Sequence, residues 1–432
     1  MKVIGIDIGT TSICGVALDA ASGQVLRSIT ENSEAFISTP NQWEKIQDVE
    51  RIVSLAFRIL GSLINEFEGD IAAIGLTGQM HGIVYLNSQG KAVSPLYTWQ
   101  DARGNLPYKD TTYAKYLGSY SGYGNVTDFY NRENGLVPEG AVTYCTVHDY
   151  VAMLLCGNTA PVLHTSDAAS LGLFDLTSCS FCCDYHPTVI ANFEIIGKYN
   201  GIPVAVAIGD NQASVFSTLA NEDELLINIG TGSQISIVSN RQITGDNVEC
   251  RPYFDEKYLI VGSALCGGRA YSLLKDFYKS VLNYADVTDK DVYSIMDRML
   301  SEKSTTSLSV DTRFDGTRSN SDITGSITGI TVNNLTPPDL TFGVLCGMID
   351  ELYGMYLTMG EKRCGIVASG NGIRKNKALA RIASRIFSAP LRIPAHLEEA
   401  ACGAAFFALV SISGSKDTSI IRNLIKYTEE QL

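Results

Sequence analysis

The stretch Met1-Lys-Val-Ile-Gly-Ile-Asp-Ile-Gly-Thr-Thr-Ser12 sets the expectation for the fold. An apolar run, Val3 to Ile8, is interrupted by a single acid, Asp7, and ends in the polar turn Gly9 to Ser12. A second apolar run, Ile13 to Leu18, follows at once. Short apolar runs on either side of a glycine-containing turn are typical of paired strands, so the stretch predicts strand, tight turn and strand.

The polar groups of this turn suit an anion. A carboxylate within a buried strand needs a cation or a hydrogen-bonding partner, and Asp7 therefore predicts one close by. Gly9 lets the backbone approach a ligand, while the amides and hydroxyls of Thr10 and Thr11 can face a phosphate. A phosphate with its Mg²⁺ fits, since Mg²⁺ prefers oxygen ligands. An ordinary hairpin explains the same residues, and the stretch alone does not decide between the two.

The composition predicts a globular chain with two domains. The 432 residues exceed what one core usually holds, and 45% are hydrophobic while 18% are charged. Apolar runs are too short to span a membrane and no basic leader opens the chain, so we expect a cytoplasmic protein with no membrane partner. The net charge of −13 argues against nucleic acid as a partner, which leaves local dipoles and a metal to hold any nucleotide.

The eleven cysteines do not form the framework of a disulfide-rich protein, because their number is odd and many lie in apolar stretches. One cluster stands out: Cys179, Cys182, Cys183 and His186. Its spacing would allow a zinc ion, but a second tight pair of ligands is absent. A surface loop with reduced thiols is the favoured interpretation.

A second hairpin repeats the plan of the first. The run Leu225 to Ile229, the turn Gly230-Thr231-Gly232-Ser233 and the run Gln234 to Val238 again predict strand, turn and strand. The repetition predicts an α/β fold of two domains built on one plan, which we place at residues 1–217 and 218–432, with the last helix packing back on the first domain.

The remaining elements follow from the spacing of apolar residues. Residues 175–201 have no strong period and are expected to form a loop. The predicted helices cover residues 49–64, 148–155, 211–219, 268–281, 289–300, 337–356, 376–387, 398–410 and 417–430.

Asp210 lies between a buried strand, Pro203 to Ile208, and the helix predicted over 211–219. A carboxylate at that point either caps the helix or projects toward a ligand. In the second case it could accept a proton from a hydroxyl that attacks the γ-phosphate of ATP. The chain has no lysine-containing glycine loop of the Walker type, so a nucleotide would be held differently.

Six motifs, taken in order, resemble those of the FGGY family of carbohydrate kinases. They are Ile4-Gly-Ile-Asp-Ile-Gly-Thr-Thr11, Gly78-Gln-Met-His-Gly82, Trp99-Gln-Asp101, Gly209-Asp-Asn211, Ile229-Gly-Thr-Gly232 and Ser369-Gly-Asn-Gly372. The resemblance covers nearly the whole chain. It implies two duplicated ribonuclease-H-like domains of the actin-like ATPase kind, with ATP and a sugar in the cleft between them, and ATP and Mg²⁺ as cofactors.

The resemblance also implies roles for individual residues. Asp210 matches the family's catalytic base and Asp7 its metal-associated acid, so both are expected on the Mg²⁺ side of the site. The ATP-binding positions would be Gly9, Thr10, Thr11, Gly230, Thr231, Gly232, Gly370 and Asn371. The sugar-binding positions would be Gln79, Met80, His81, Trp99, Asp101 and Asn211. The residues by themselves leave two alternatives open, a His81 satisfied within a turn and a Trp99 in the core.

Within the family, the segments 98–104, 209–215 and 368–376 are most similar to those of sedoheptulokinases. This implies conversion of sedoheptulose to sedoheptulose 7-phosphate, with xylulokinase or another sugar or polyol kinase as the alternative. An actin-like assembly or sensor protein is an alternative of another class, but it has no need of the polar breaks at 78–82 and 99–101. The segment before Asp210 is shorter than is usual in the family, so the choice of ketose stays open, as does a homodimer.

Overall fold

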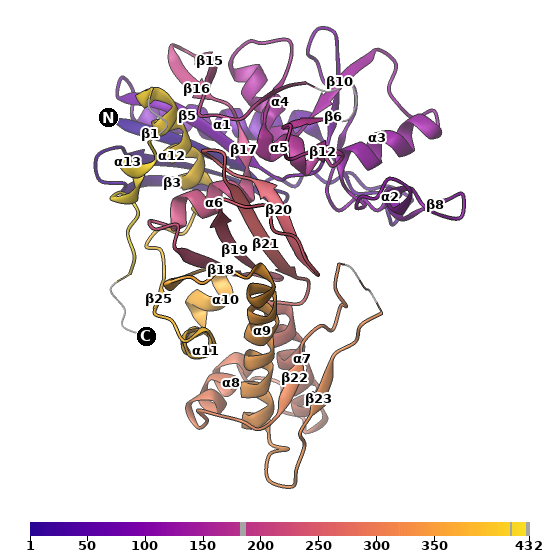
Figure 1. Ribbon diagram of the computed structural model, residues 1–432, viewed down its shortest axis with the longest axis vertical. Coiled ribbons are helices and arrows are strands. Elements are labelled where there is room, and N and C mark those ends of the chain that lie inside the picture. The colour runs from indigo at the N-terminus through magenta and orange to yellow at the C-terminus, as the bar shows by residue number, and fades with distance from the viewer. Residues whose placement is uncertain (182–186, 319, 321, 415–416, 429–432) are drawn as a thin grey trace. The chain divides into compact units, whose positions relative to one another are not determined.

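The computed structural model describes residues 1–181, 187–318, 320, 322–414 and 417–428. The chain divides into two compact units (Figure 1). Unit 1 contains residues 1–220, 251–258 and 396–426, and unit 2 contains residues 221–250, 259–395 and 427–432. Each unit is built around one main β-sheet with helices.

The sheet of unit 1 grows from the first hairpin. Strands β1 (Lys2–Ile8) and β2 (Ser12–Asp19) pair antiparallel and close with Ile8 opposite Ile13, and β3 (Val25–Asn32) adds antiparallel to β2. Strand β5 (Ile71–Gly78) runs parallel to β1 on the other side, followed by β16 (Ile202–Ala205) and β15 (Ile195–Tyr199). The short strand β17 (Ile208–Gly209) also pairs parallel with β5. The predicted hairpin is therefore present, and β1 and β5 both end at the same edge of the sheet.

Helix α12 (Glu399–Ser413) packs unusually closely on the centre of this sheet (Figure 1). A Cβ on Gly5 would lie 1.8 Å from the carbonyl oxygen of Ala401, and one on Gly75 would lie 1.9 Å from that of Ala404. Side chains at these strand positions would push the helix away, so the two glycines set the approach of α12. Helices α1 (Val49–Glu66) and α4 (Val147–Leu155) complete the same core with their apolar faces.

The sheet of unit 2 repeats the arrangement. Its strand order is β20, β21, β19, β18, β24, β25, with the second hairpin formed by β18 (Glu224–Ile229) and β19 (Ser233–Ser239). Strand β24 (Gly365–Ser369) runs parallel to β18, as β5 does to β1. The remaining strands are β20 (Val248–Pro252), β21 (Tyr258–Ala264) and β25 (Leu391–Arg392).

The helices of unit 2 begin and end close to the predicted residues. The predicted ones are α7 (Gly268–Tyr284), α8 (Val292–Ser301), α9 (Pro337–Met359) and α11 (Lys377–Phe387), of which α7, α8 and α9 lie together in Figure 1. The short helix α10 (Gly370–Lys375) forms where only a turn was expected. Helix α9 shows why the termini could be predicted: Thr336 caps its first turn, prolines occupy its first positions, and Gly360 ends it in the left-handed conformation with a φ of 67°.

Two sequence-based expectations are wrong. The segment 175–201 is not a plain loop, since β14 (Thr188–Ile190) and the edge strand β15 lie within it. An edge strand has one free side and its residues are only partly buried, so the apolar alternation that marks a strand is weak there. The helix expected over 417–430 is reduced to α13 (Ser419–Arg422) among the described residues.

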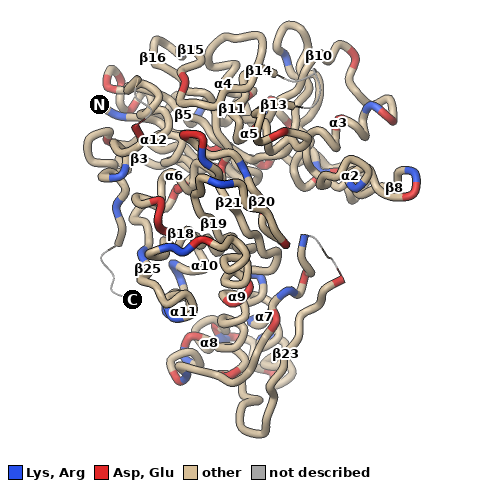
Figure 2. Tube along the Cα trace, in the orientation of Figure 1, with Lys and Arg blue, Asp and Glu red and all other residues tan. Residues whose placement is uncertain are grey.

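Charged residues are interspersed along the traces of both units rather than gathered in one basic run (Figure 2). Within the part of the chain that the structure describes, no helix combines the length and the apolar character needed to cross a bilayer.

Candidate active site

The predicted acids of unit 1 converge because three parallel strands end together. Asp7 on β1 lies opposite Thr77 on β5, and Thr77 lies opposite Ile208 on β17. Asp210 follows β17 directly and begins helix α6 (Asp210–Thr218). Since ligands of α/β proteins bind beyond the carboxyl ends of parallel strands, this sheet edge is the candidate active site of unit 1.

Asp210 is the first residue of α6 and not its cap. Gly209 occupies the cap position, with φ of −61° and ψ of 143°. The capping alternative therefore does not hold, and the carboxylate belongs to the first turn of the helix, where the dipole favours a negative charge. Burial raises the pKa of Asp210, while His148 and Arg251 act in the opposite direction.

The environment of Asp7 disfavours the charged form of its carboxyl group. Its Oδ1 is buried and has no hydrogen-bond partner among the described residues. Burial raises the pKa of Asp7 to about 7, and the nearby carboxylates of Asp210 and Glu398 add to the effect. A poorly solvated carboxylate with two further carboxylates nearby favours a bound cation or a proton. Glu398, at the start of α12, is a member of this group that the sequence reasoning did not identify.

A second group of ionisable side chains lies fully buried behind the strand ends. It comprises His148, Asp149 and Asp167, which are near enough to one another to share a metal ion. His148 Nε2 lies 3.0 Å from Asp167 Oδ1, and the Thr146 hydroxyl donates to Asp149 Oδ2 at 2.6 Å. Burial raises the pKa of both acids well above the usual range and lowers that of His148. These pKa shifts favour the neutral forms of the imidazole and the carboxyl groups, so the close approach of His148 and Asp167 is not an ion pair.

The turn of the first hairpin, which the sequence predicts to face a phosphate, is held by its neighbours. The carbonyl oxygen of Thr10 accepts from Nε2 of Gln47 at 2.7 Å, and that of Thr11 accepts from the backbone N–H of Ser33 at 2.8 Å. Gly9 precedes them at a tight point, since a Cβ there would lie 2.9 Å from the carbonyl oxygen of Ser12. These hydrogen bonds fix the conformation of the turn.

Trp99 and Gln79 lie beside this turn. The indole Nε1 of Trp99 donates to the Thr10 hydroxyl at 3.0 Å, and that hydroxyl donates to Gln79 Oε1 at 3.4 Å. Trp99 is 46% exposed, so it is not a core residue. Gln79 follows β5 and is buried. The structure therefore brings a predicted sugar-side residue and a predicted phosphate-side residue into direct contact.

Met80 and His81 take different positions. Met80 is buried. Its Sδ and Cε would lie within 2.8 Å of a Cβ on Gly209, so the Met80 side chain packs against the residue that precedes Asp210. His81 has a left-handed backbone, with a φ of 74°, which is costly for a residue other than glycine. Its Nδ1 lies 2.7 Å from the carbonyl oxygen of Ser170, and its ring stacks on Tyr123 at 4.3 Å between centroids.

Asp101 is not available to sugar hydroxyls in this arrangement. Its two oxygens accept from the Nε and Nη2 of Arg103 at 2.7 and 3.0 Å, and Oδ2 also accepts from the backbone N–H of Lys45. Both partners of the ion pair are buried. Arg103 extends the network to Asn131 at 2.6 Å. Asp101 thus anchors the loop that carries Trp99. An arginine two residues after an aspartate in the sequence could have indicated this ion pair.

The predicted ATP-side residues of unit 2 form a corresponding group. In the second hairpin turn, the backbone N–H of Gly230 donates to Gly232, while Gly268 and Arg269 at the start of α7 donate to Gly230 and Thr231, each at 3.0 Å. The helix N-terminus therefore braces the turn from one side. The sequence reasoning did not identify this brace.

Gly370 and Asn371 begin α10 at the end of β24. Gly370 has a φ of 84°, and a Cβ there would lie 2.6 Å from the carbonyl oxygen of Ile229. Asn228 and Ser369, the last paired residues of β18 and β24, are joined by a hydrogen bond of 2.9 Å. Within unit 2 the second hairpin turn and the turn after β24 therefore meet at the carboxyl ends of parallel strands, as in unit 1.

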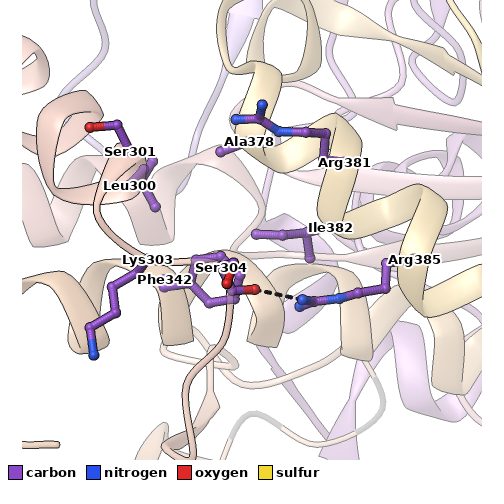
Figure 3. A pocket seen from close by; sticks show the side chains of 9 residues that line it. All are labelled: Leu300, Ser301, Lys303, Ser304, Phe342, Ala378, Arg381, Ile382 and Arg385. Atoms are coloured by element: carbon purple, nitrogen blue, oxygen red, sulfur yellow. Dashed lines mark hydrogen bonds between the residues drawn. The ribbon is translucent and has the colours of Figure 1, made fainter.

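A cavity of about 490 Å³ lies elsewhere in unit 2, beside α11 (Figure 3). Buried apolar side chains, among them Phe342 and Ile382, form its floor. Arg385 crosses it to donate to the carbonyl oxygen of Ser304 at 2.7 Å, as the dashed line shows. The lining residues are Leu300, Ser301, Lys303, Ser304, Phe342, Ala378, Arg381, Ile382 and Arg385.

The structure describes only one member of the predicted cysteine cluster. Cys182, Cys183 and His186 lie outside the described residues, and Cys179 is exposed.

Comparison with known families decides the identity of the fold. The model of the N-terminal domain of the FGGY family of carbohydrate kinases matches residues 2–109, and that of the C-terminal domain matches residues 225–412. The chain belongs to the FGGY family of carbohydrate kinases. It is therefore an ATP-dependent sugar kinase with the two-domain actin-like ATPase fold, as the sequence predicted.

Individual relatives agree with this assignment. The chain is 29% identical to the sedoheptulokinase of Mus musculus, over 94% of this chain and 97% of that protein. It is also 29% identical to the sedoheptulokinase of Homo sapiens over the same shares. The crystal structure of the gluconate kinase from Lactobacillus acidophilus superposes with a TM-score of 0.86, covers 99% of this chain and 92% of that chain, and has 19% identity, which supports the fold alone.

Proposed function

We propose that this FGGY kinase transfers the γ-phosphoryl group of ATP to a ketose, and that the ketose is sedoheptulose, giving sedoheptulose 7-phosphate. The observation that carries the choice of sugar is similarity to two sedoheptulokinases over nearly the whole of both chains. Xylulose is the alternative substrate, because xylulose kinases are the next most similar relatives, with the Staphylococcus epidermidis enzyme 22% identical over 99% of this chain.

We propose Asp210 as the general base. In the transfer, the attacking sugar oxygen forms a bond to the γ-phosphorus, the bond from that phosphorus to the β,γ-bridging oxygen breaks, and ADP leaves. The hydroxyl proton passes to the Asp210 carboxylate. Two features support this role: the carboxylate lies in the first turn of α6, directly after β17, and burial raises its pKa, so that it holds a proton more readily than an ordinary aspartate.

Mg²⁺ fits the acids at the same strand ends. Asp7 and Asp210 would hold the ion, directly or through its waters, because the buried Oδ1 of Asp7 has no partner among the described residues and carboxylate oxygens suit Mg²⁺. When bound, the ion supplies positive charge to the phosphate oxygens. The same cation would also relieve the crowding of Asp7, Asp210 and Glu398.

The other residues bind and orient the substrates. Backbone amides of the two glycine-threonine turns suit phosphate oxygens, and the turn after β24 is proposed for the adenosine. Trp99 offers an exposed apolar wall and Gln79, His81 and Asn211 offer polar groups to the sugar, while Asp101 acts through the loop it anchors. The ATP-side set is Gly9, Thr10, Thr11, Gly230, Thr231, Gly232, Gly370 and Asn371.

The test is a coupled ADP-release assay of the wild-type chain with sedoheptulose, xylulose, ribulose, fructose and glycerol. We expect the highest kcat/KM with sedoheptulose and a product whose phosphorus signal is that of a primary phosphate ester. A clear preference for xylulose would move the assignment to the alternative, and a preference for glycerol would overturn the ketose proposal.

The base is tested by Asp210→Asn, which keeps the size of the side chain. Loss of a general base lowers kcat by about 10²- to 10⁴-fold, while ATP and sugar still bind. Asp223→Asn is a matched exposed control in the same chain and should retain wild-type turnover. A kcat for Asp210→Asn within about threefold of wild type would contradict the role of Asp210.

A further inference from the structure

One continuous line of hydrogen bonds joins the exposed wall of the site to the phosphate turn. It begins at the indole of Trp99, which donates to the hydroxyl of Thr10, and passes from that hydroxyl to Oε1 of Gln79. Nε2 of Gln79 donates to Oε1 of Gln47 at 2.9 Å. Nε2 of Gln47 then donates to the carbonyl oxygen of Thr10 at 2.7 Å, so the line returns to the residue it passed through.

Chemistry fixes the direction of every bond in this line. The indole N–H of Trp99 can only donate, and the carbonyl oxygen of Thr10 can only accept. The Thr10 hydroxyl must therefore accept from Trp99 and donate to Gln79, whose amide nitrogen is then turned toward Gln47. Reversing the amide of Gln47 would set its oxygen against the carbonyl oxygen of Thr10 and its nitrogen against the amide nitrogen of Gln79. Each amide has one orientation that satisfies both of its neighbours.

Gln47 occupies the least accessible position in the line. Its exposed fraction is 0%, against 46% for Trp99. It lies in the short strand β4 (Ile46–Gln47), which pairs antiparallel with β7 (Leu96–Tyr97), two residues before Trp99. Gln47 therefore cannot touch a substrate in this arrangement. Its backbone pairs with the strand that leads to Trp99, and its side chain bonds to Gln79 and Thr10, all of which we assign to binding.

We infer that Gln47 is a positioning residue that couples the sugar side of the site to the phosphate turn. The inference rests on the proposed function for the roles of Trp99, Gln79 and Thr10. A sugar packed against Trp99 orders the indole, and the indole orders the Thr10 hydroxyl. Gln47 holds the Gln79 amide and the Thr10 carbonyl in the only pattern that satisfies this hydroxyl. Buried polar groups that share partners shift together, since leaving one unpaired is costly.

The test is Gln47→Leu, which keeps much of the volume and removes both hydrogen-bonding groups. Gln79 Nε2 loses its acceptor, and the Thr10 carbonyl loses its shorter donor, keeping only the Ser33 hydroxyl at 3.4 Å. We expect the KM for ATP and the KM for the sugar to rise together, each by about tenfold, as the loss of one buried partner implies. We also expect saturating sugar to lose its effect on the ATP dissociation constant.

Two comparisons separate positioning from a general structural defect. A less stable fold lowers the active fraction, and hence kcat, but leaves both KM values and the coupling between ligands unmoved. The exposed Gln24→Leu is the matched control and should behave as wild type. Trp99→Phe breaks the line at its other end, so the effects of Gln47→Leu and Trp99→Phe on the KM for ATP should be strongly non-additive.

The kinetic experiment uses whichever sugar the wild-type chain turns over best, so an error in the proposed ketose shows in the wild type and leaves this test intact. Unchanged KM values and an unchanged sugar effect on ATP binding in Gln47→Leu would overturn the inference. Simple additivity with Trp99→Phe would do the same.

Discussion

Replacing Arg103 with Met should expose how much unit 1 depends on one buried ion pair. Arg103 and Asp101 have side chains that are 2% and 0% exposed, and two hydrogen bonds of 2.7 and 3.0 Å join them. Met keeps the unbranched apolar stem of the side chain but ends at the level of the arginine Nε, so the contact between the guanidinium carbon and Tyr97, whose ring centroid lies 4.3 Å away, is lost as well. The change therefore removes the charge, its donors and this contact.

The size of the effect follows from what is left behind. A buried carboxylate without its partner costs about 3–5 kcal/mol, and the surviving N–H donors of Lys45 and Arg103 itself, at 3.0 and 3.1 Å, place the loss at the lower end of that range. With a urea m-value of about 3 kcal/mol/M, the unfolding midpoint of unit 1 falls by about 1 M. Because Asp101 anchors the loop of Trp99, the KM for the sugar should rise as well.

The measurement is urea unfolding followed by tryptophan fluorescence. Both tryptophans, Trp43 and Trp99, belong to unit 1, so the signal reports that unit. Arg27→Met is the control: its pair with Glu66, at 3.4 Å, has side chains that are 52% and 47% exposed, and such pairs contribute about 0.2–1 kcal/mol. Equal losses in Arg103→Met and Arg27→Met would refute the reasoning.

Two further predictions concern the rest of the chain. Burial raises the pKa of Glu351 to about 7, so unit 2 should lose stability as the pH rises from the pKa of an unfolded glutamate through 7. In thermal melts at pH 5 to 8.5, Glu351→Gln should flatten this trend. The exposed Glu302→Gln should leave it unchanged. A Cβ on Gly403 would lie 1.9 Å from the Ala213 carbonyl oxygen, so Gly403→Ala should destabilise unit 1 by about 1–3 kcal/mol or more. Gly61 lies in helix α1 with open space around the position of a Cβ, so Gly61→Ala should stabilise unit 1 by about 0.5–1 kcal/mol. Denaturant titrations measure both changes. A stable Gly403→Ala would show that α12 can shift.

Local features explain what the sequence predicted well. The two hairpins and the long helices are marked by short-range patterns: apolar runs that break at a glycine turn, caps such as Thr336, and the terminal Gly360. The order of six motifs then identified the family. The edge strand β15 was missed because its partly buried residues carry little alternation.

The site was predicted less completely, since side-chain partners distant in sequence cannot be read from a local pattern. Trp99 was left between wall and core, and only the structure shows the indole exposed and bound to Thr10. The group of His148, Asp149 and Asp167 was not predicted, because its members come from separate helices that only the fold brings together. Asp101 was expected to meet a sugar, although Arg103 two residues on was an available partner.

The properties that make the strand ends of unit 1 suitable for phosphoryl transfer have one physical origin. Strands β1, β5 and β17 are parallel, so Asp7 and Asp210, which are far apart in the sequence, must approach each other where these strands end. Burial raises both pKa values, and the charge of Asp210 adds to the effect on Asp7, which favours a proton acceptor and a bound cation at the same place. The proposed base and the proposed metal-side acid therefore share one structural origin, whereas on the same proposal the choice of sugar would depend on the wall around Trp99 and on the hydrogen bonds that hold it.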